Sequence, residues 1–461
     1  MAAPPFRRIL VANRGEIAVR IIRACDRLGI ESVVAVSDAD RESLAVRLAT
    51  RSICIGPAAA SQSYLRPELL IRAARGAGCE ALHPGYGFLS ERAEFSRMCA
   101  ASGITFIGPA PGAIAAMGDK ISAIAIAGKA GVPRVPGSGR IASLADAGAF
   151  AREHGYPVLI KASAGGGGRG MRVVRRAEDF GREIEAAAAE AQAAFGDPTL
   201  YVEKFIQRAR HIEIQVLGDR HGNIVHLGER DCFIQRRHQK LIEEAPSPAI
   251  DAQLRADLAS AAVALAKQVG YVGAGIVEFV FDEDTRRWYF LEMNTRIQVE
   301  HPVTEMIYGR DLVVEQIRIA AGAPISFTQA ELSLTGHAIE CRINAEDAAC
   351  DFAPSPGLIT NWHAPTDTGI RIDTHCFAGY CVPPYYDSLL AKVIAHGSSR
   401  ARAIERMMAA LERLEITGIA TTAPFHRQVL EHEDFKSGMI TTRWVEEKFF
   451  AKPAPSENRG H

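Results

Sequence analysis

Short apolar runs alternate with a helical pattern along the first hundred residues. Strand-like runs lie at 9–12, 32–36 and 105–107, and apolar residues recur at helical spacing over 17–28. Strands that alternate with helices are typical of an open, mainly parallel sheet. The N-terminal part of the chain is therefore predicted to be an α/β layer.

The turn after the first strand carries a partial nucleotide-binding signal. Its sequence, ANRGEIA, stands where a dinucleotide fingerprint would be, and Asp38 lies near the place of a ribose-binding acid. Only Gly15 of the three fingerprint glycines is present. A packed α/β layer without a dinucleotide is the favoured interpretation.

The middle of the chain reads as a connection followed by a small unit. Residues 110–140 are rich in glycine, alanine and proline, which predicts a linker that holds one helix over 117–129. The small unit has three strand-like runs, at 158–161, 171–174 and 200–203, and one helical run at 179–195. Mixed strands and long helices follow, and the polar, proline-bearing tail is expected to be disordered.

A glycine-rich loop joins two strands of the small unit. In KASAGGGGRGMRVV, Lys161 precedes the run Gly165, Gly166, Gly167 and Gly168. Consecutive glycines let backbone N–H groups surround a phosphate without Cβ collisions. The pattern is not GxxxxGK[ST], so a P-loop is excluded, and MRVV continues as a strand. We predict a hairpin that covers phosphates as a lid; a flexible hairpin tip is the alternative.

Two acidic residues lie on consecutive strand-like runs. The runs are AGIVEFVF (274–281) and RWYFLEMN (287–294), joined by a polar turn. If the hairpin folds symmetrically, Glu278 lies opposite Glu292, and Asn294 shares their face. Carboxylates about 4.5–5.5 Å apart at Cβ repel unless a cation lies between them. Hard oxygen ligands favour Mg²⁺ carried by a nucleotide, and the apolar flanks argue against two solvated acids.

Two basic segments accompany this hairpin. ERDCFIQRRHQK precedes it, and NTRIQVEHPVTE directly continues its second strand; their polar residues include Arg230, Arg236, Arg237, His238, Lys240, Arg296, Gln298, Glu300 and His301. A charge run alone is usually a solvated face. Because the second run continues the predicted metal strand, its side chains are expected beside the γ-phosphate of ATP. A base such as Glu300 next to Arg296 could deprotonate a small acid that the arginine binds.

Charge and cysteine usage exclude several partners. Lysine and arginine number 53 against 54 aspartates and glutamates, which gives no electrostatic reason to expect nucleic acid or a membrane. Nine cysteines without a CxxC pair fit neither a disulfide framework nor a zinc site.

The longest apolar stretch is broken by Lys267 and Gln268, and the N-terminus lacks a signal-peptide run. We expect a cytoplasmic protein.

Taken in order, the motifs of the chain resemble those of biotin carboxylase along nearly its whole length. LEMNTRIQVEHPVTE is highly specific by itself. The other matching segments are HPGYGFLSE (83–91), MGDK (117–120), the glycine loop, ERDC with QRRHQK, ECRINAED (340–347), PSPG (354–357) and PPYYDS (383–388). One departure is Ala164, where many members of the family carry another glycine.

The resemblance implies an α/β protein with the ATP-grasp fold. A Rossmann-like N-terminal domain is expected at 1–115, followed by a linker at 116–134 and a small lid domain at 135–203. A large mixed α+β C-terminal catalytic domain is expected at 204–449, and a disordered tail at 450–461. The nucleotide would lie between the lid and the C-terminal sheet.

The resemblance also implies an ATP site and a metal site. ATP would contact Lys120, Lys161, Gly165, Gly166, Gly167, Gly168, Glu203, Lys204, Ile206, His211, Gln235 and His238, several of them through the main chain, with Glu278 and Glu292 close to its phosphates. Two Mg²⁺ ions, with Mn²⁺ as an alternative, would be held by Glu278, Glu292 and Asn294. The predicted pairing of the two strands places the same three residues on one face of the hairpin.

The remaining implied residues carry the second substrate and biotin. Bicarbonate would be bound by Lys240, Arg296, Gln298, Val299 and Glu300. Glu300 corresponds to the base that deprotonates bicarbonate, and Arg342 to the residue that stabilises the biotin enolate. The implied reaction forms carboxyphosphate from ATP and bicarbonate and then carboxylates biotin. Spacing alone does not identify Arg342.

The partners follow from the same resemblance. The sequence contains no MKM-type biotin-attachment motif and no carboxyltransferase domain, so we expect biotin on a separate biotin carboxyl carrier protein, together with carboxyltransferase subunits. A homodimer is expected from the family. Acetyl-CoA carboxylase is the commonest setting for a free-standing subunit, while propionyl-CoA, methylcrotonyl-CoA and pyruvate remain open as final acceptors.

Two other functions are weighed against this one. Another ATP-grasp ligase, such as a carbamoyl-phosphate or purine-pathway enzyme, would share the nucleotide residues but lack RIQVEHPVTE followed by ECRINAED. An ATP-binding scaffold subunit without catalysis would be expected to have lost Glu300, Arg296 or Arg342. All three are present.

Overall fold

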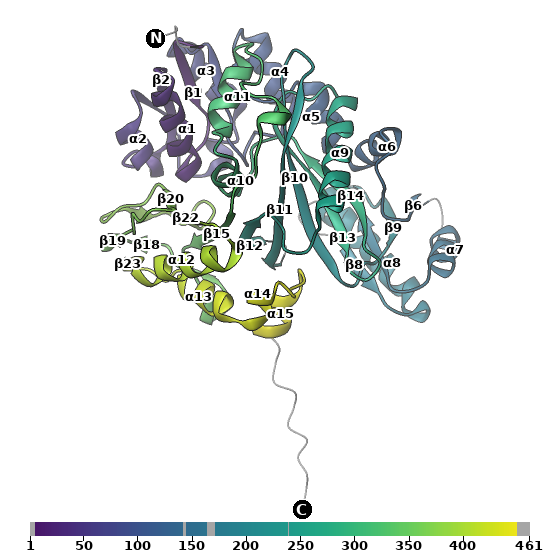
Figure 1. Ribbon diagram of the computed structural model, residues 1–461. Helices are drawn as coiled ribbons and strands as arrows, with labels where there is room; N and C mark the ends of the chain where they lie inside the picture. The colour runs from purple at the N-terminus through teal and green to yellow at the C-terminus, as the bar shows by residue number, and fades with distance from the viewer. Residues whose placement is uncertain (1–4, 142–143, 164–170, 238, 450–461) are drawn as a thin grey trace, which may run out of the picture.

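The N-terminal part is a five-stranded parallel sheet in the order β3-β2-β1-β4-β5. The computed structural model describes residues 5–141, 144–163, 171–237 and 239–449. The strands of this sheet are β1 (Arg8–Val11), β2 (Glu31–Ser37), β3 (Arg51–Gly56), β4 (Ala81–His83) and β5 (Thr105–Phe106). Helices α1 (Gly15–Arg27), α2 (Leu44–Leu48), α3 (Pro67–Gly76) and α4 (Ala93–Ala101) pack around them (Figure 1). The predicted α/β layer is confirmed.

The first strand shows why this layer has two cores. Side chains alternate between the faces of a strand, so Ile9 and Val11 pack with Ile17 of α1, while Leu10 packs with Leu70 of α3. All of these side chains are almost completely buried. An apolar run without polar alternation is the pattern of a parallel strand that is covered on both faces.

The connection after this layer differs from the prediction. Instead of one helix over 117–129 there are two, α5 (Pro111–Gly118) and α6 (Lys120–Lys129). Asp119 separates them: its backbone is extended, and its carboxylate accepts a hydrogen bond from the Ser122 N–H at 2.8 Å. An N-cap of this kind starts a new helix at the following residue, which is Lys120.

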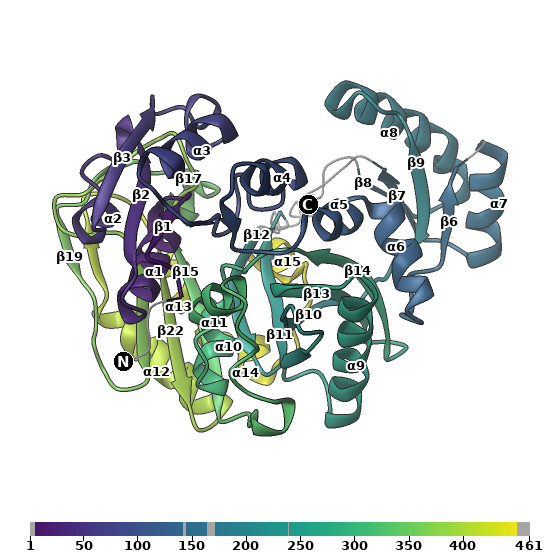
Figure 2. The ribbon, with the colours of Figure 1, turned by 90° about the horizontal axis from the view of Figure 1, so that it is seen from above.

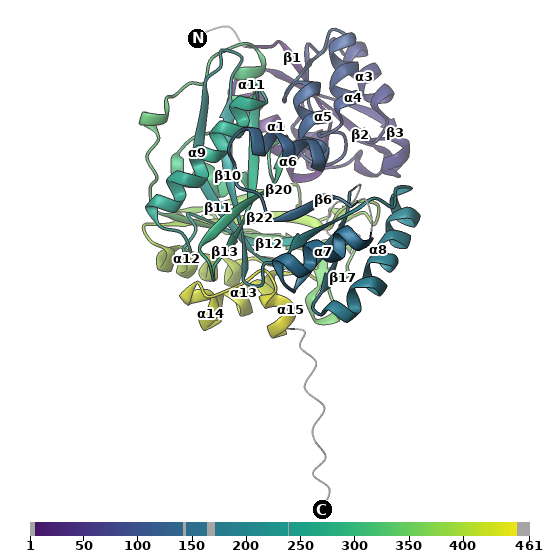
Figure 3. The same ribbon diagram turned by 90° about the vertical axis from the view of Figure 1, so that its right-hand side faces the viewer.

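The small unit is a four-stranded sheet in the order β6-β9-β7-β8 with two helices. Its elements are β6 (Gly137–Arg140), α7 (Leu144–His154), β7 (Val158–Ala162), β8 (Met171–Val174), α8 (Phe180–Phe195) and β9 (Leu200–Lys204). The predicted strands and helix are present, and β6 and α7 are additional. Figure 2 shows this unit at the opposite end of the molecule from β1–β3, and Figure 3 views the molecule from the side on which α7 and α8 lie. The glycine loop joins β7 to β8, but residues 164–170 lie outside the described part.

An eight-stranded antiparallel sheet forms the largest part, in the order β14-β13-β10-β11-β12-β15-β22-β20. Its strands are β10 (Ala209–Gly218), β11 (Ile224–Arg236), β12 (Gln239–Ala245), β13 (Gly273–Asp282), β14 (Arg287–Asn294), β15 (His337–Asn344), β20 (Ile370–Thr374) and β22 (Leu389–Gly397). The helices of this part are α9 (Ala252–Gln268), α10 (His301–Tyr308), α11 (Leu312–Ala320), α12 (Arg400–Arg413), α13 (Ala423–Glu431), α14 (Glu433–Ser437) and α15 (Trp444–Phe449). Short pairs complete it: β16 (Glu346–Asp347) with β17 (Ala353–Pro354), β18 (Gly357–Leu358) with β21 (Cys381–Val382), and β19 (Asn361–His363) with β23 (Glu415–Thr417).

The hairpin of β13 and β14 has the predicted register around Glu278, at the end away from its turn. Glu278 pairs with Glu292, as expected from a symmetric hairpin. A β-bulge directly after Glu278 shifts the register, so that Phe279 pairs with Phe290 toward the turn.

Among the described helices, none combines the length and the apolar character that a membrane crossing requires.

Candidate active site

One cavity of about 830 Å³ lies where the three parts of the chain meet. Most of the residues expected from the sequence line it: Lys120, Lys161, Glu203, His211, Gln235, Lys240, Glu278, Glu292, Asn294, Arg296, Gln298, Val299, Glu300 and Arg342. The N-terminal layer contributes Tyr86 and Gly87. The lining does not include Lys204 or Ile206. Gly165, Gly166, Gly167, Gly168 and His238 lie outside the described residues.

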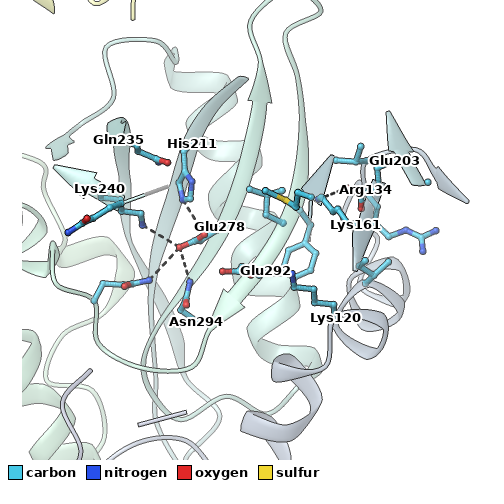
Figure 4. Close-up of a pocket in the computed structure, with 18 of the residues that line it drawn as sticks. Lys120, Arg134, Lys161, Glu203, His211, Gln235, Lys240, Glu278, Glu292 and Asn294 are labelled. Carbon is cyan, nitrogen blue, oxygen red and sulfur yellow. Dashed lines mark hydrogen bonds and ion pairs between the residues drawn. The ribbon is translucent and has the colours of Figure 1, made fainter. Parts of the chain in front are cut away.

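The end of the cavity beside the small sheet is basic. Lys161 of β7 and Glu203 of β9 form an ion pair at 2.5 Å, and Figure 4 shows them on the far side of the cavity from Glu278. Lys120 begins α6, and burial lowers its pKa. The Lys204 ammonium donates to the carbonyls of His154 and Gly155, at 3.0 Å each. Its side chain therefore stabilises the small unit itself.

The two carboxylates of the hairpin have unequal surroundings. Glu278 accepts a hydrogen bond from Asn294 at 2.8 Å and lies 3.2 Å from His211 and 3.3 Å from Lys240 (Figure 4). Burial would raise the pKa of Glu278, but Lys240 and His211 outweigh it and hold that pKa well below the usual range. Glu292 has no hydrogen-bond or ion-pair partner in the described part of the chain. Burial first, and the charge of Glu278 second, raise the pKa of Glu292.

This arrangement fits a bound cation. A carboxylate without a partner, placed opposite an ionised carboxylate on the neighbouring strand, gains from a positive charge between the two. The donors available are the oxygens of Glu278, Glu292 and Asn294. Hard oxygen donors beside an open cavity are typical of Mg²⁺, which keeps room for water and phosphate oxygens.

Lys240 joins three carboxylates beneath this pair. Its ammonium lies 2.6 Å from Glu213, 2.7 Å from Glu300 and 3.3 Å from Glu278. Two acidic groups that could each hold an ion, His211 with Glu213 and Glu278, and Glu213 with Cys232 and Glu300, both surround this position. Lys240 already supplies a positive charge to both of these groups, whereas no ion pair to Glu292 is present in the described part of the chain.

Glu300 is buried among cations. Its Oε1 lies 2.7 Å from Lys240 and its Oε2 lies 2.9 Å from Arg342. Burial would raise the pKa of Glu300, but Lys240, Arg342 and Arg230 outweigh it and hold the pKa well below the ordinary value. The carboxylate is therefore ionised at neutral pH and can accept a proton. The same cations can bind an anionic substrate beside it.

Arg296 approaches the same place from the segment after β14. Its guanidinium donates to Gln298 Oε1 at 2.8 Å and to Glu91 Oε2 at 2.8 Å. Glu91 also accepts the Thr295 N–H at 3.0 Å. The N-terminal layer thus fixes the start of the segment that leads to Glu300, a contact that sequence reasoning did not predict.

Two further residues of the site, Arg342 and Glu213, were not predicted from sequence spacing. Arg342 reaches the cavity from β15 and lies 2.5 Å from the fully buried Glu243. Glu213 is also fully buried, and it bridges Lys240 and Arg230 at 2.6 and 2.5 Å. A signal for Glu213 was present, because HIEIQV places polar residues at alternate positions of a strand with apolar residues between them.

The fold and the cavity define an ATP-grasp enzyme, and sequence comparison specifies the family. The family models that match are "Biotin carboxylase, N-terminal domain" over residues 5–114, "Carbamoyl-phosphate synthase L chain, ATP binding domain" over 119–328 and "Biotin carboxylase C-terminal domain" over 340–447. The chain is 52% identical to biotin carboxylase 1 of Bacillus subtilis (strain 168) over 96% of its length and 98% of that protein. The chain therefore belongs to the biotin carboxylase family.

Solved structures support the same assignment. The biotin carboxylase–β,γ-ATP complex from Campylobacter jejuni is similar with a TM-score of 0.92 and 46% identity, over 96% of this chain and 99% of that one. The biotin carboxylase domain dimer of 2-oxoglutarate carboxylase from Hydrogenobacter thermophilus, solved with MgADP, ADP and bicarbonate, has a TM-score of 0.90 and 48% identity. That comparison covers 96% of this chain and 97% of the other.

Proposed function

We propose that this protein uses MgATP and bicarbonate to carboxylate biotin that is carried on a separate protein. The observation that carries the proposal is the buried Glu300 carboxylate, which lies between Lys240 and Arg342 in the same cavity as the Glu278–Glu292 pair. A proton acceptor, a cluster of cations for an anion and a carboxylate pair for a metal are the groups that this reaction needs.

The residue roles in this proposal follow the resemblance to the family, and most of the residues line the cavity. The ATP residues are Lys120, Lys161, Gly165, Gly166, Gly167, Gly168, Glu203, Lys204, Ile206, His211, Gln235 and His238. Mg²⁺ would be held by Glu278, Glu292 and Asn294, and when bound it would neutralise charge on the phosphoryl group. Bicarbonate would be bound by Lys240, Arg296, Gln298 and Val299. The division into domains at 1–115, 135–203 and 204–449 is part of the same proposal.

The chemistry of the chain's own residues has two stages. Glu300 accepts the proton of bicarbonate, while Lys240 and Arg296 hold the resulting dianion in place for attack on the γ-phosphorus of ATP, from which ADP leaves. In the second stage carboxyphosphate breaks down to CO₂ and phosphate, and the phosphate takes the N1 proton of biotin. The Arg342 guanidinium then stabilises the enolate oxygen of biotin while its N1 attacks CO₂. The lid excludes water, which would otherwise hydrolyse the carboxyphosphate that forms between the stages.

Partners and final acceptor belong to the proposal as well. We assign the chain to acetyl-CoA carboxylase, working with a biotin carboxyl carrier protein and carboxyltransferase subunits as a homodimer. The related Hydrogenobacter domain is a dimer, which supports the proposed homodimer, but it belongs to a 2-oxoglutarate carboxylase. Purification of the native complex, followed by assay with acetyl-CoA, propionyl-CoA, methylcrotonyl-CoA, pyruvate and 2-oxoglutarate, tests the acceptor. Carboxylation of an acceptor other than acetyl-CoA would contradict the assignment.

The activity itself is tested with the purified chain. ADP release should depend on bicarbonate and Mg²⁺ and should rise when free biotin is added. A folded protein that binds MgATP but releases no ADP in response to bicarbonate would refute the proposed function.

A further inference from the structure

A lysine outside the cavity contacts the backbone of the segment that carries Glu300. Lys392 lies in the middle of β22 and is completely buried. Its ammonium donates to the Val299 carbonyl at 2.9 Å and lies 3.0 Å from Glu16 Oε1 and 3.8 Å from Asp373 Oδ2. Val299 lines the cavity, whereas Lys392 is not among the lining residues.

Charge neutralisation alone does not explain this contact. A buried ammonium is costly unless it is paired and its protons are bonded. Of its two carboxylate neighbours, Asp373 already has a second cation, because Arg371 lies 2.7 Å from it. Glu16 has Lys392 as its ion-pair partner at 3.0 Å. Lys392 also acts on the buried Glu340, but burial outweighs it and raises the pKa of Glu340 well above the ordinary value. One proton of the ammonium is nevertheless directed to a main-chain carbonyl of the loop.

The neighbouring carbonyl is held in the same way. His301 is fully buried, and its Nδ1 lies 2.7 Å from the Gln298 carbonyl, so Nδ1 carries the proton. Burial, reinforced by Lys392 and Arg20, lowers the pKa of His301 well below its ordinary value, so the ring is neutral. Side chains beneath the loop therefore fix two consecutive carbonyls.

Fixing these two carbonyls also fixes the direction of the N–H groups that follow them. In a planar trans peptide the C=O and the following N–H point in opposite directions. His301 thus orients the Val299 N–H, and Lys392 orients the Glu300 N–H. Neither N–H donates to another group in the described part of the chain. Val299 and Glu300 both line the cavity, so the orientation of these two peptide groups bears on how an anion is bound there.

We propose that Lys392 is a positioning residue for bicarbonate: by fixing the Val299 carbonyl it aligns the N–H groups that face the anion and the Glu300 carboxylate that takes its proton. The inference rests on the proposed function and names one further residue of the same site. Lys392 also links the site to the N-terminal layer, because Glu16 of α1 accepts a hydrogen bond from the hydroxyl of Tyr86, which lines the cavity.

The test compares Lys392→Met with the double variant Lys392→Met/Glu16→Gln. The single variant leaves Glu16 as a buried carboxylate without a cation and should lower Tm. The double variant removes that charge and should restore Tm. In both, the KM for bicarbonate should rise about 10-fold or more, the scale of one lost charge-assisted hydrogen bond, while the KM for MgATP changes by less than about twofold.

Two control variants distinguish a positioning effect of Lys392 from a general loss of protein stability. Arg400→Met removes another cation that contacts a buried carboxylate, Glu244 at 2.7 Å, and a main-chain carbonyl, that of Lys436 at 2.8 Å. It should lower Tm without changing the KM for bicarbonate. Glu16→Gln alone keeps the Lys392 contact with Val299 and should also leave that KM unchanged.

Each contrary outcome has a distinct meaning. If the double variant regains both Tm and the wild-type KM for bicarbonate, Lys392 only neutralises Glu16 and the positioning role is wrong. An equal rise in KM in Arg400→Met or in Glu16→Gln would also overturn it. If the wild-type chain shows no bicarbonate-dependent ADP release, the proposed function fails first, and the inference with it.

Discussion

Arg342 Nη2 lies 2.9 Å from Glu300 Oε2, so the group assigned to biotin directly contacts the group assigned to bicarbonate. Glu300 is completely buried and keeps Lys240 as a second partner at 2.7 Å. While both cations contact it, the carboxylate is ionised but only weakly basic. A biotin oxygen that draws Arg342 away would remove one cation and raise the pKa of Glu300. The contact thus offers a physical link between the two stages of the reaction.

The carboxylate pair predicts the behaviour of Glu292→Gln. Burial and the charge of Glu278 raise the pKa of Glu292, so ionised Glu292 is unfavourable in the metal-free protein. The variant should therefore keep or raise the metal-free Tm, while the rise in Tm that Mg²⁺ causes in the presence of a non-hydrolysable ATP analogue should shrink. Asp284→Asn, at the exposed turn of the same hairpin, is the matched control and should behave as wild type. An unchanged response to Mg²⁺ in Glu292→Gln would rule out the metal assignment.

Acid should destabilise the protein through His426, whose Nε2 contacts the Arg342 carbonyl at 2.6 Å. Burial lowers the pKa of His426 to about 4 from an ordinary value near 6.5. The folded state thus resists protonation, so this contribution to stability is complete above pH 6.5 and is lost as pH falls toward 4. His426→Gln should remove about 2–3 kcal/mol of the loss in unfolding free energy between pH 7 and pH 4.

Denaturant unfolding at a series of pH values measures this effect. His363→Gln changes an exposed histidine and should leave the pH dependence as it is in the wild type. If His426→Gln has the same slope with pH as the wild type, His426 does not resist protonation in the folded protein.

The carrier proposal predicts that the chain itself is not biotinylated. A streptavidin blot of the purified protein should be blank, while a co-purified carrier should give a band. A positive band at the mass of this chain would mean that biotin is attached here, which would contradict delivery by a separate protein.

Local patterns in the sequence predicted some of this site well. The Glu278–Glu292 pairing follows from two short strands and a turn, so few registers were available, and the bulge after Glu278 affected only the end near the turn. The parallel N-terminal layer follows from alternating strands and helices. The break at Asp119 was missed because alanine-rich, apolar segments lie on both sides of it, and only the hydrogen bond from the Ser122 N–H to the Asp119 carboxylate reveals the start of a new helix.

Contacts between distant strands could not be predicted in this way. β15 lies beside β12 in the sheet, an order that does not follow the chain, and this places Arg342 beside Glu243 of β12. Glu300 comes from the separate segment after β14 and meets both Lys240 of β12 and Arg342. Only the resemblance to a family pointed to this arginine. Lys392 was not identified at all, since a lysine within an apolar strand gives no sign of which carbonyl it contacts.

The two proposed stages of the reaction are separated most directly by the variants Glu300→Gln and Arg342→Ala. ADP and carboxybiotin are measured in each variant at saturating ATP, with Arg400→Met as a control outside the cavity. Glu300→Gln should suppress both products, while nucleotide binding through Lys120, Lys161 and Glu203 persists. Arg342→Ala should lower carboxybiotin by about 10²–10³ but reduce bicarbonate-dependent ADP release far less. A parallel loss of both products in Arg342→Ala, together with intact ATP cleavage in Glu300→Gln, would contradict both assignments.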